Sequence, residues 1–135
     1  GKFEYYARLR DLRAKQPFTL LIGNDCVFTR ARTDGADGVI SGVACGVPEL
    51  MVGLDRAICS GNTAKADQLE ARLQEYIKWL GNFPTPLGVK ETTGMRGINV
   101  GPHAIPLSPG RQRKLEEFRE WFKGWLPQIQ KEVVW

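Results

Sequence analysis

Two short strand-like segments, separated by a stretch of crossover length, constrain most strongly how this chain can fold. Residues 18–22 (FTLLI) form a continuous apolar run, which is typical of a strand buried on both faces of a parallel sheet. Residues 37–41 (DGVIS) predict a second strand. Between them, Asp25 suits a helix N-cap and Gly35 a helix end, so a helix is expected over about 26–34. The pattern predicts two adjacent parallel strands of an α/β fold.

The rest of the chain is predicted to be helical. An amphipathic pattern precedes the first strand, and apolar spacing with Pro and Gly breaks follows the second. The expected helices lie at residues 3–15, 48–60, 63–81, 86–93 and 109–131, with a Gly- and Pro-rich loop at 94–107.

Two strands do not form a sheet that is stable alone, whereas a (β/α)8 TIM barrel has eight strands in about 250 residues. The predicted fold class is therefore α/β, as the C-terminal part of a TIM barrel with its last two strands, followed by a C-terminal helical region. Residues 1–46 are assigned to the barrel segment, and residues 47–135 to helices that cover the barrel and to the helical region. Because a helix precedes the first strand, we expect a segment of a longer protein.

Composition excludes several functions. With 42% hydrophobic and 25% charged residues, the chain resembles soluble globular domains. No apolar run approaches the roughly 18 residues that span a bilayer, and no signal-peptide layout is visible, so no membrane partner is expected. The net charge is +4, but acidic residues are mixed into the basic stretches around Arg10 and Arg113, so no nucleic acid is expected either. An odd number of cysteines, Cys26, Cys45 and Cys59, favours free thiols in the cytoplasm.

The candidate site lies where the predicted strands end, because parallel α/β folds carry function in the loops after their strands. Six residues in these loops are candidate substrate-binding residues: Gly23, Asn24, Asp25, Ile40, Ser41 and Gly42. Glycine lets a ligand approach the backbone closely. In the alternative interpretation, Gly23 and Gly42 serve only the turns and Asp25 only caps a helix.

The same segments resemble a known family. LLIGND, followed by GADGVIS, is similar to the seventh and eighth strands of the dihydrodipicolinate synthase and N-acetylneuraminate lyase family of class I pyruvate-type aldolases. The later PTPLGVK and AIPLSP resemble the family's helical C-terminal region, and the agreement extends from about Gly1 to Leu126. The resemblance implies a homo-oligomeric lyase or aldolase, commonly a tetramer, that acts on pyruvate or another 2-oxo acid together with an aldehyde or sugar acid.

In this family a sixth-strand lysine forms an imine with the 2-oxo acid, and the imine is the electron sink for making or breaking a carbon–carbon bond. Gly1 matches the last glycine of the family motif GIKxxSG. The resemblance therefore implies that the Schiff-base lysine lies just before Gly1, that no catalytic residue lies in this chain, and that the chain alone is inactive. It also implies no cofactor besides the covalent imine. From the residues themselves, no Cys or His spacing indicates a metal site, so no metal is expected.

What this chain is expected to contribute is the wall of the site. Gly23 and Ile40 match family positions whose backbone lines the pocket, and Asp25 matches a position that binds substrate hydroxyls in the sialic-acid lyase branch. Cys26 stands where that branch has a Glu, and Gly42 where it has a Ser. These differences count against N-acetylneuraminate and leave the aldehyde or sugar-acid partner open.

Two other functions stay open. A dehydratase could use the same imine to remove water from a 2-keto-3-deoxy sugar acid, and a helical interaction module would need no catalysis. A binding module would tolerate polar groups at Gly23 and Gly42, whereas an imine pocket would not.

Other reactive side chains are interpreted as structural. Lys90, in GVKETTG, resembles a Schiff-base motif, but it follows both strand segments. The single histidine, His103, is expected at the surface, and Cys45 is expected to be a buried, inert thiol. The tryptophans Trp121, Trp125 and Trp135 are expected to pack the last helix onto a barrel or a neighbouring subunit.

Overall fold

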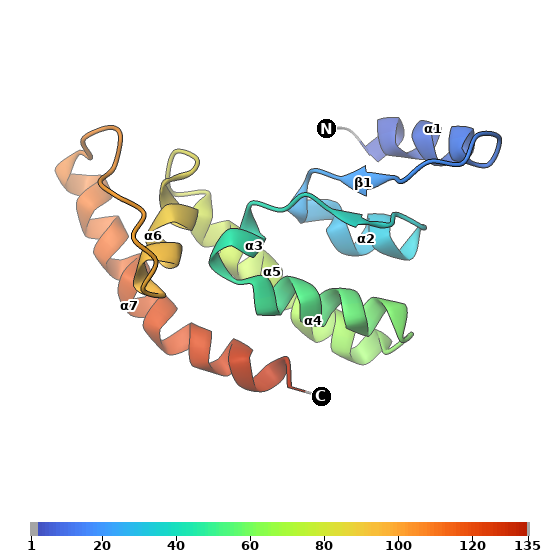
Figure 1. Cartoon of the computed structure of the whole chain (residues 1–135). Coiled ribbons are helices and arrows are strands. Elements are labelled where there is room, and N and C mark those ends of the chain that lie inside the picture. The colour runs from blue at the N-terminus through green and yellow to red at the C-terminus, as the bar shows by residue number, and fades with distance from the viewer. Residues whose placement is uncertain (1–2, 135) are drawn as a thin grey trace.

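A computed structural model describes residues 3–134 as two short parallel strands among helices (Figure 1). The elements are α1 (Phe3–Arg13), β1 (Leu21–Ile22), the 3-10 helix η1 (Asp25–Val27), α2 (Phe28–Thr33), β2 (Gly38–Val39), α3 (Val43–Gly46), α4 (Pro48–Cys59), α5 (Thr63–Leu80), α6 (Leu87–Met95) and α7 (Pro109–Glu132). In Figure 1, α1, β1 and α2 lie at one end, and α7 runs along the opposite side with α6 packed against it.

The two strands pair in parallel, with Leu21 opposite Gly38 and Ile22 opposite Val39. This pairing confirms the predicted pair of adjacent parallel strands joined by a helix. Each strand is shorter than predicted, and the expectation that the first is buried on both faces is wrong, because Leu21 is 45% exposed. Only one edge of each strand has a ladder partner within residues 3–134, and Ile40, just after β2, is 68% exposed.

The crossover differs in detail from its prediction. The stretch expected as one helix over 26–34 consists of η1 followed by α2. Asp25 is not its N-cap; the Asn24 side chain instead accepts a hydrogen bond from the Cys26 amide at 3.0 Å. The Asn24 side chain folds back onto the amide two residues on, as asparagine does in turns. Gly35 follows with a φ of 99°, a conformation that suits glycine at a helix end.

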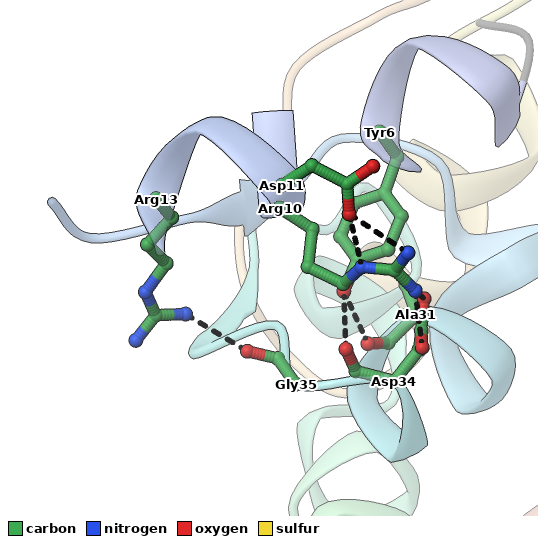
Figure 2. A network of polar contacts seen from close by, with 7 residues as sticks. All are labelled: Tyr6, Arg10, Asp11, Arg13, Ala31, Asp34 and Gly35. Carbon is green, nitrogen blue, oxygen red and sulfur yellow. Dashed lines mark hydrogen bonds and ion pairs between the residues drawn. The ribbon is translucent and has the colours of Figure 1, made fainter. Parts of the chain in front are cut away.

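Tyr6 and Arg10 of α1 bind residues at the C-terminal end of α2, as Figure 2 shows. Tyr6 is buried, and its hydroxyl lies 2.9 Å from the Ala31 carbonyl oxygen and 3.2 Å from that of Asp34. Burial, followed by the nearby charge of Asp34, raises the pKa of Tyr6 above its ordinary value. The Arg10 guanidinium binds both carboxylate oxygens of Asp34 at 2.6 Å. These contacts orient α1 relative to the start of β2.

A second set of contacts fixes the register of the strands. Arg13 donates to the Gly35 carbonyl at 2.9 Å and to Asp37 Oδ1 at 2.8 Å. The other carboxylate oxygen of Asp37 accepts from the Leu20 amide at 2.7 Å, and the Asp37 amide donates to the Leu20 carbonyl at 2.9 Å. Asp37, the residue before β2, is therefore bonded to Leu20, the residue before β1.

The main core lies among the helices that follow β2. The predicted helices α4, α5, α6 and α7 are present, with ends within two residues of the predicted ones. The stripe predicted for α7 is buried throughout: Leu115, Phe118, Phe122, Trp125 and Ile129. Trp121 and Trp125 stack on Tyr76 of α5, so these two tryptophans pack α7 onto another helix of this chain. Trp135 lies outside the described residues.

This core also reaches the strand end of the molecule. Phe28 of α2 and Val43 of α3 are buried in the same cluster as the residues of α4 to α7. The boundary between residues 1–46 and 47–135 stays a prediction. Within residues 3–134, no helix has both the length and the apolar character that a membrane span requires.

Candidate functional site

The loops that follow β1 and β2 leave the same end of the strand pair, because the strands are parallel. Gly23 and Asn24 directly follow β1, and Asp25 begins η1. Ile40, Ser41 and Gly42 connect β2 to α3. The six predicted substrate-binding residues thus occupy two neighbouring loops.

Asp25 joins the two loops. Its Oδ2 accepts from the Val43 amide at 3.4 Å, at the first residue of α3, and a Cβ added to Gly42 would lie 3.9 Å from the same oxygen. The helix that Asp25 caps is therefore α3, across the site, rather than the crossover helix. Its Oδ1 is buried and has no hydrogen-bond partner within residues 3–134. A buried carboxylate oxygen without a donor is costly, so this atom is suited to a ligand hydroxyl or amide.

The two loop glycines are not required by the backbone of this chain. Neither Gly23 nor Gly42 has a positive φ. A Cβ on Gly23 would meet no atom within 4 Å, and one on Gly42 would meet only the Asp25 carboxylate. Neither turn geometry nor packing therefore requires glycine at positions 23 and 42, and a side chain at either would have room.

The other loop residues lie in different surroundings. The Ser41 hydroxyl accepts from the Ala44 amide at 2.9 Å and so caps α3. Gly23 and Asn24 also line an apolar hollow of about 320 Å³ between α1 and β1, to which Ile40, Ser41 and Gly42 do not contribute. Among the six candidates, the contacts bring Asp25 and Gly42 together most directly.

The sequence did not predict α3 or the contacts that hold it. Gly46, its last residue, lies so close to α5 and α6 that an added Cβ would clash with Tyr76 Oη and Thr92 Oγ1. The Tyr76 and Thr92 hydroxyls are 2.6 Å apart and buried. Burial, opposed by the hydrogen bond with Thr92, raises the pKa of Tyr76 to about 12. The small residues of GVACG were the only local signal for this close approach.

The remaining reactive side chains are placed as follows. Lys90 lies in α6 rather than at a strand end, and its ammonium donates to the Pro102 carbonyl. His103 is half-buried, with Nε2 3.2 Å from Glu91 Oε2, so it lies only partly at the surface. The expectation of a buried Cys45 is wrong, because the single turn of α3 directs Val43 and Gly46 inward and leaves Cys45 exposed.

Metal binding requires several convergent ligands. Within the described part of the chain, no three His, Cys, Asp or Glu side chains gather in a way that could hold a metal ion.

Two of the curated proteins that are similar in sequence to this chain have the same name. The chain is 31% identical over 109 residues to the 4-hydroxy-tetrahydrodipicolinate synthase of Methanothrix thermoacetophila, a match that covers 81% of this chain and 37% of that protein. It is 32% identical over 119 residues to the synthase of the same name from Desulforudis audaxviator, covering 88% and 40%. The chain thus spans about two fifths of the length of these curated relatives.

Solved structures share the fold. A variant of the Sulfolobus solfataricus 2-keto-3-deoxygluconate aldolase, in complex with L-2-keto, 3-deoxy-galactonate, matches with a TM-score of 0.76 at 17% identity, covering 92% of this chain and 43% of that one. Dihydrodipicolinate synthase from Aquifex aeolicus matches with a TM-score of 0.71 at 24% identity, covering 89% and 42%. At these identities the likeness shows the fold alone, which is that of a part of these TIM-barrel proteins.

The sequence agreement extends over almost the whole chain. The family model described as the dihydrodipicolinate synthetase family matches residues 1–124, which include both strands, both loops of the candidate site and most of α7. This chain therefore belongs to the dihydrodipicolinate synthetase family.

Proposed function

We propose that this chain is the C-terminal part of a Schiff-base lyase, in which β1 and β2 are the last two strands of a (β/α)8 barrel. Membership of the family supports a lyase, and the matched structures are more than twice as long as this chain. The outer edges of both strands, which have no ladder partner within residues 3–134, support the placement, since a barrel would pair them with further strands.

The imine chemistry is assigned to a lysine that precedes Gly1. Its neutral amine would attack the ketone carbon of the 2-oxo acid, and loss of water would leave an iminium that accepts the electron pair of the neighbouring bond. The lysines of residues 3–134 lie on helices or, for Lys15, in the turn after α1. Water keeps such ammonium groups protonated and poorly nucleophilic.

The observation that carries the proposal is the free oxygen of Asp25. Asp25 Oδ1 is buried between the loops that follow β1 and β2 and has no donor within residues 3–134. A hydroxyl of the aldehyde or sugar-acid partner would supply that donor. The carboxylate of the 2-oxo acid would not contact Asp25 Oδ1, because two carboxylates in contact repel each other. Gly23, Asn24, Ile40, Ser41 and Gly42 are proposed to complete the pocket wall around this contact.

Reductive trapping tests the assignment of the lysine. The full-length protein would be incubated with pyruvate, reduced with sodium borohydride and mapped by mass spectrometry, with residues 1–135 alone in parallel. We expect one adduct per full-length chain, on a lysine before Gly1, and none within residues 1–135. An adduct on Lys90, or on any other lysine of this chain, would overturn the assignment.

Product analysis separates the two imine reactions. The alternative is a dehydratase that uses the same imine, in which water rather than an aldehyde leaves the sugar acid. NMR of the products from a 2-keto-3-deoxy sugar acid would show pyruvate and an aldehyde for a lyase, and an intact, dehydrated carbon chain for a dehydratase. Retention of all carbons in one product would favour the dehydratase.

The intact protein is further proposed to be a homo-oligomer, a tetramer as is common in the family, with small-molecule substrates only. Light scattering of the purified full-length protein gives the number of subunits directly.

A further inference from the structure

Helix α3 leads directly out of the candidate site, and it is too short to be stable by itself. It has four residues, Val43–Gly46, and an isolated helical turn is unfavourable because fixing its backbone costs more than its hydrogen bonds return. At its first residue the Val43 amide contacts Asp25, and before it Ser41 caps the turn. Helix α3 therefore contacts both site loops, the first through Asp25 and the second through Ser41.

The other end of α3 is held by α6. Thr93 Oγ1 lies 3.0 Å from the carbonyl oxygen of Cys45, in the single turn of α3. The same hydroxyl lies 2.9 Å from the Val89 carbonyl oxygen. Since a hydroxyl has one proton, the two carbonyl oxygens share it, and Thr93 lies between the backbones of α6 and α3.

A second tie lies just beyond α3. Arg96, at the end of α6, donates to Glu49 Oε1 at 2.7 Å, in the first turn of α4. Both side chains are largely buried, with 24% and 20% of their surfaces exposed. Between the two ties, Gly46 packs directly against the Tyr76 and Thr92 hydroxyls. Helix α6 therefore holds the chain on both sides of Gly46.

We propose that Thr93 and Arg96 are positioning residues for the substrate site: they hold α3 so that Asp25 and Gly42 stay at the separation that a hydroxylated substrate requires. This inference rests on the proposed function. It assigns to α6, a helix much later in the chain than the site loops, the task of fixing their geometry. If α3 moves, the Val43 amide moves from Asp25, and the Asp25 carboxylate loses the donor that orients it.

The test uses the full-length protein with pyruvate and D-glyceraldehyde as the probe substrates. Thr93→Val removes the hydroxyl but keeps the shape, Thr93→Ser restores the hydroxyl, and Arg96→Gln cuts the second tie. Thr33→Val is the matched control, because Thr33 lies at the exposed end of α2 and its hydroxyl makes no hydrogen bond within residues 3–134. Steady-state kinetics, borohydride trapping of the pyruvate imine and amide hydrogen exchange are measured for each variant.

We expect Thr93→Val and Arg96→Gln to raise the KM for D-glyceraldehyde by about fivefold, the effect of losing one hydrogen bond, while trapping of the pyruvate imine stays at the parental yield. Thr93→Ser and Thr33→Val should keep the parental KM. Amides of residues 43–46 should exchange faster in Thr93→Val, with those of α5 unchanged, which distinguishes release of α3 from general destabilisation.

Two outcomes separate the possible errors. If the parent protein forms no imine with pyruvate, the proposed function fails and this inference fails with it. If the imine forms but Thr93→Val and Arg96→Gln keep the parental KM, or if Thr33→Val raises it equally, the proposed function stands and the positioning role is refuted.

Discussion

Replacing Thr92 with valine removes one member of a buried hydroxyl pair at the centre of the helical core. Thr92 and Tyr76 are both fully buried, and their hydroxyl oxygens are 2.6 Å apart. The Thr92 oxygen also lies 3.0 Å from the Val89 carbonyl oxygen. A carbonyl can only accept, so Thr92 donates to Val89 and Tyr76 donates to Thr92. Because burial raises the pKa of Tyr76 to about 12, the phenol keeps its proton at all ordinary pH values.

The two single substitutions should therefore have unequal effects. Thr92→Val leaves the Tyr76 hydroxyl buried without an acceptor, which should cost about 1–3 kcal/mol of the free energy of unfolding. Tyr76→Phe removes that donor, but Thr92 keeps its bond to Val89, so the cost should be only about 0.5–1.5 kcal/mol. In the double variant no donor is stranded, and its cost should be close to that of Tyr76→Phe plus the lost Val89 contact.

Urea unfolding of the full-length protein, followed by tryptophan fluorescence, measures these differences, since Trp121 and Trp125 stack on Tyr76. A double-mutant cycle then gives the coupling between the two hydroxyls, expected at about 1–2 kcal/mol. Strictly additive effects, or a greater loss in Tyr76→Phe than in Thr92→Val, would refute the assignment of donor and acceptor.

Two further predictions concern the strand end of the chain. The pKa of Asp37 is lowered, first by the Leu20 amide and then by Arg13, so its stabilising effect is present above the pKa of an unfolded Asp and is lost as the pH falls through the lower, folded value. Asp37→Asn should therefore reduce the dependence of stability on pH in the acid range, measured by unfolding at a series of pH values; an unchanged profile would contradict this. In the full-length protein, Gly23→Val should block pyruvate imine formation with little loss of fold, since a Cβ there meets nothing within 4 Å, and normal turnover of this variant would refute the site assignment.

Local physics accounts for what the sequence by itself determined. The apolar spacing of α5 and α7 is repeated every three or four residues, so it predicts the buried faces without knowledge of the partner. The end of α2 requires a positive φ, and the glycine at position 35 signals it. The pair of parallel strands follows from two strand-like runs with a crossover between them. The family resemblance identified the same two loops as the candidate site.

Only the tertiary structure decided how those loops are held. The sequence indicated Asp25 as the cap of the helix that directly follows it. The helix that Asp25 contacts is instead α3, whose first residue lies 18 residues further on. Any side chain larger than that of Gly46 would clash with the hydroxyls of Tyr76 and Thr92, which come from two later helices and meet beside it. No pattern within a few residues encodes such contacts, because each depends on where several helices pack after they have formed. The site loops are local in the sequence, but their geometry is a property of the whole helical core.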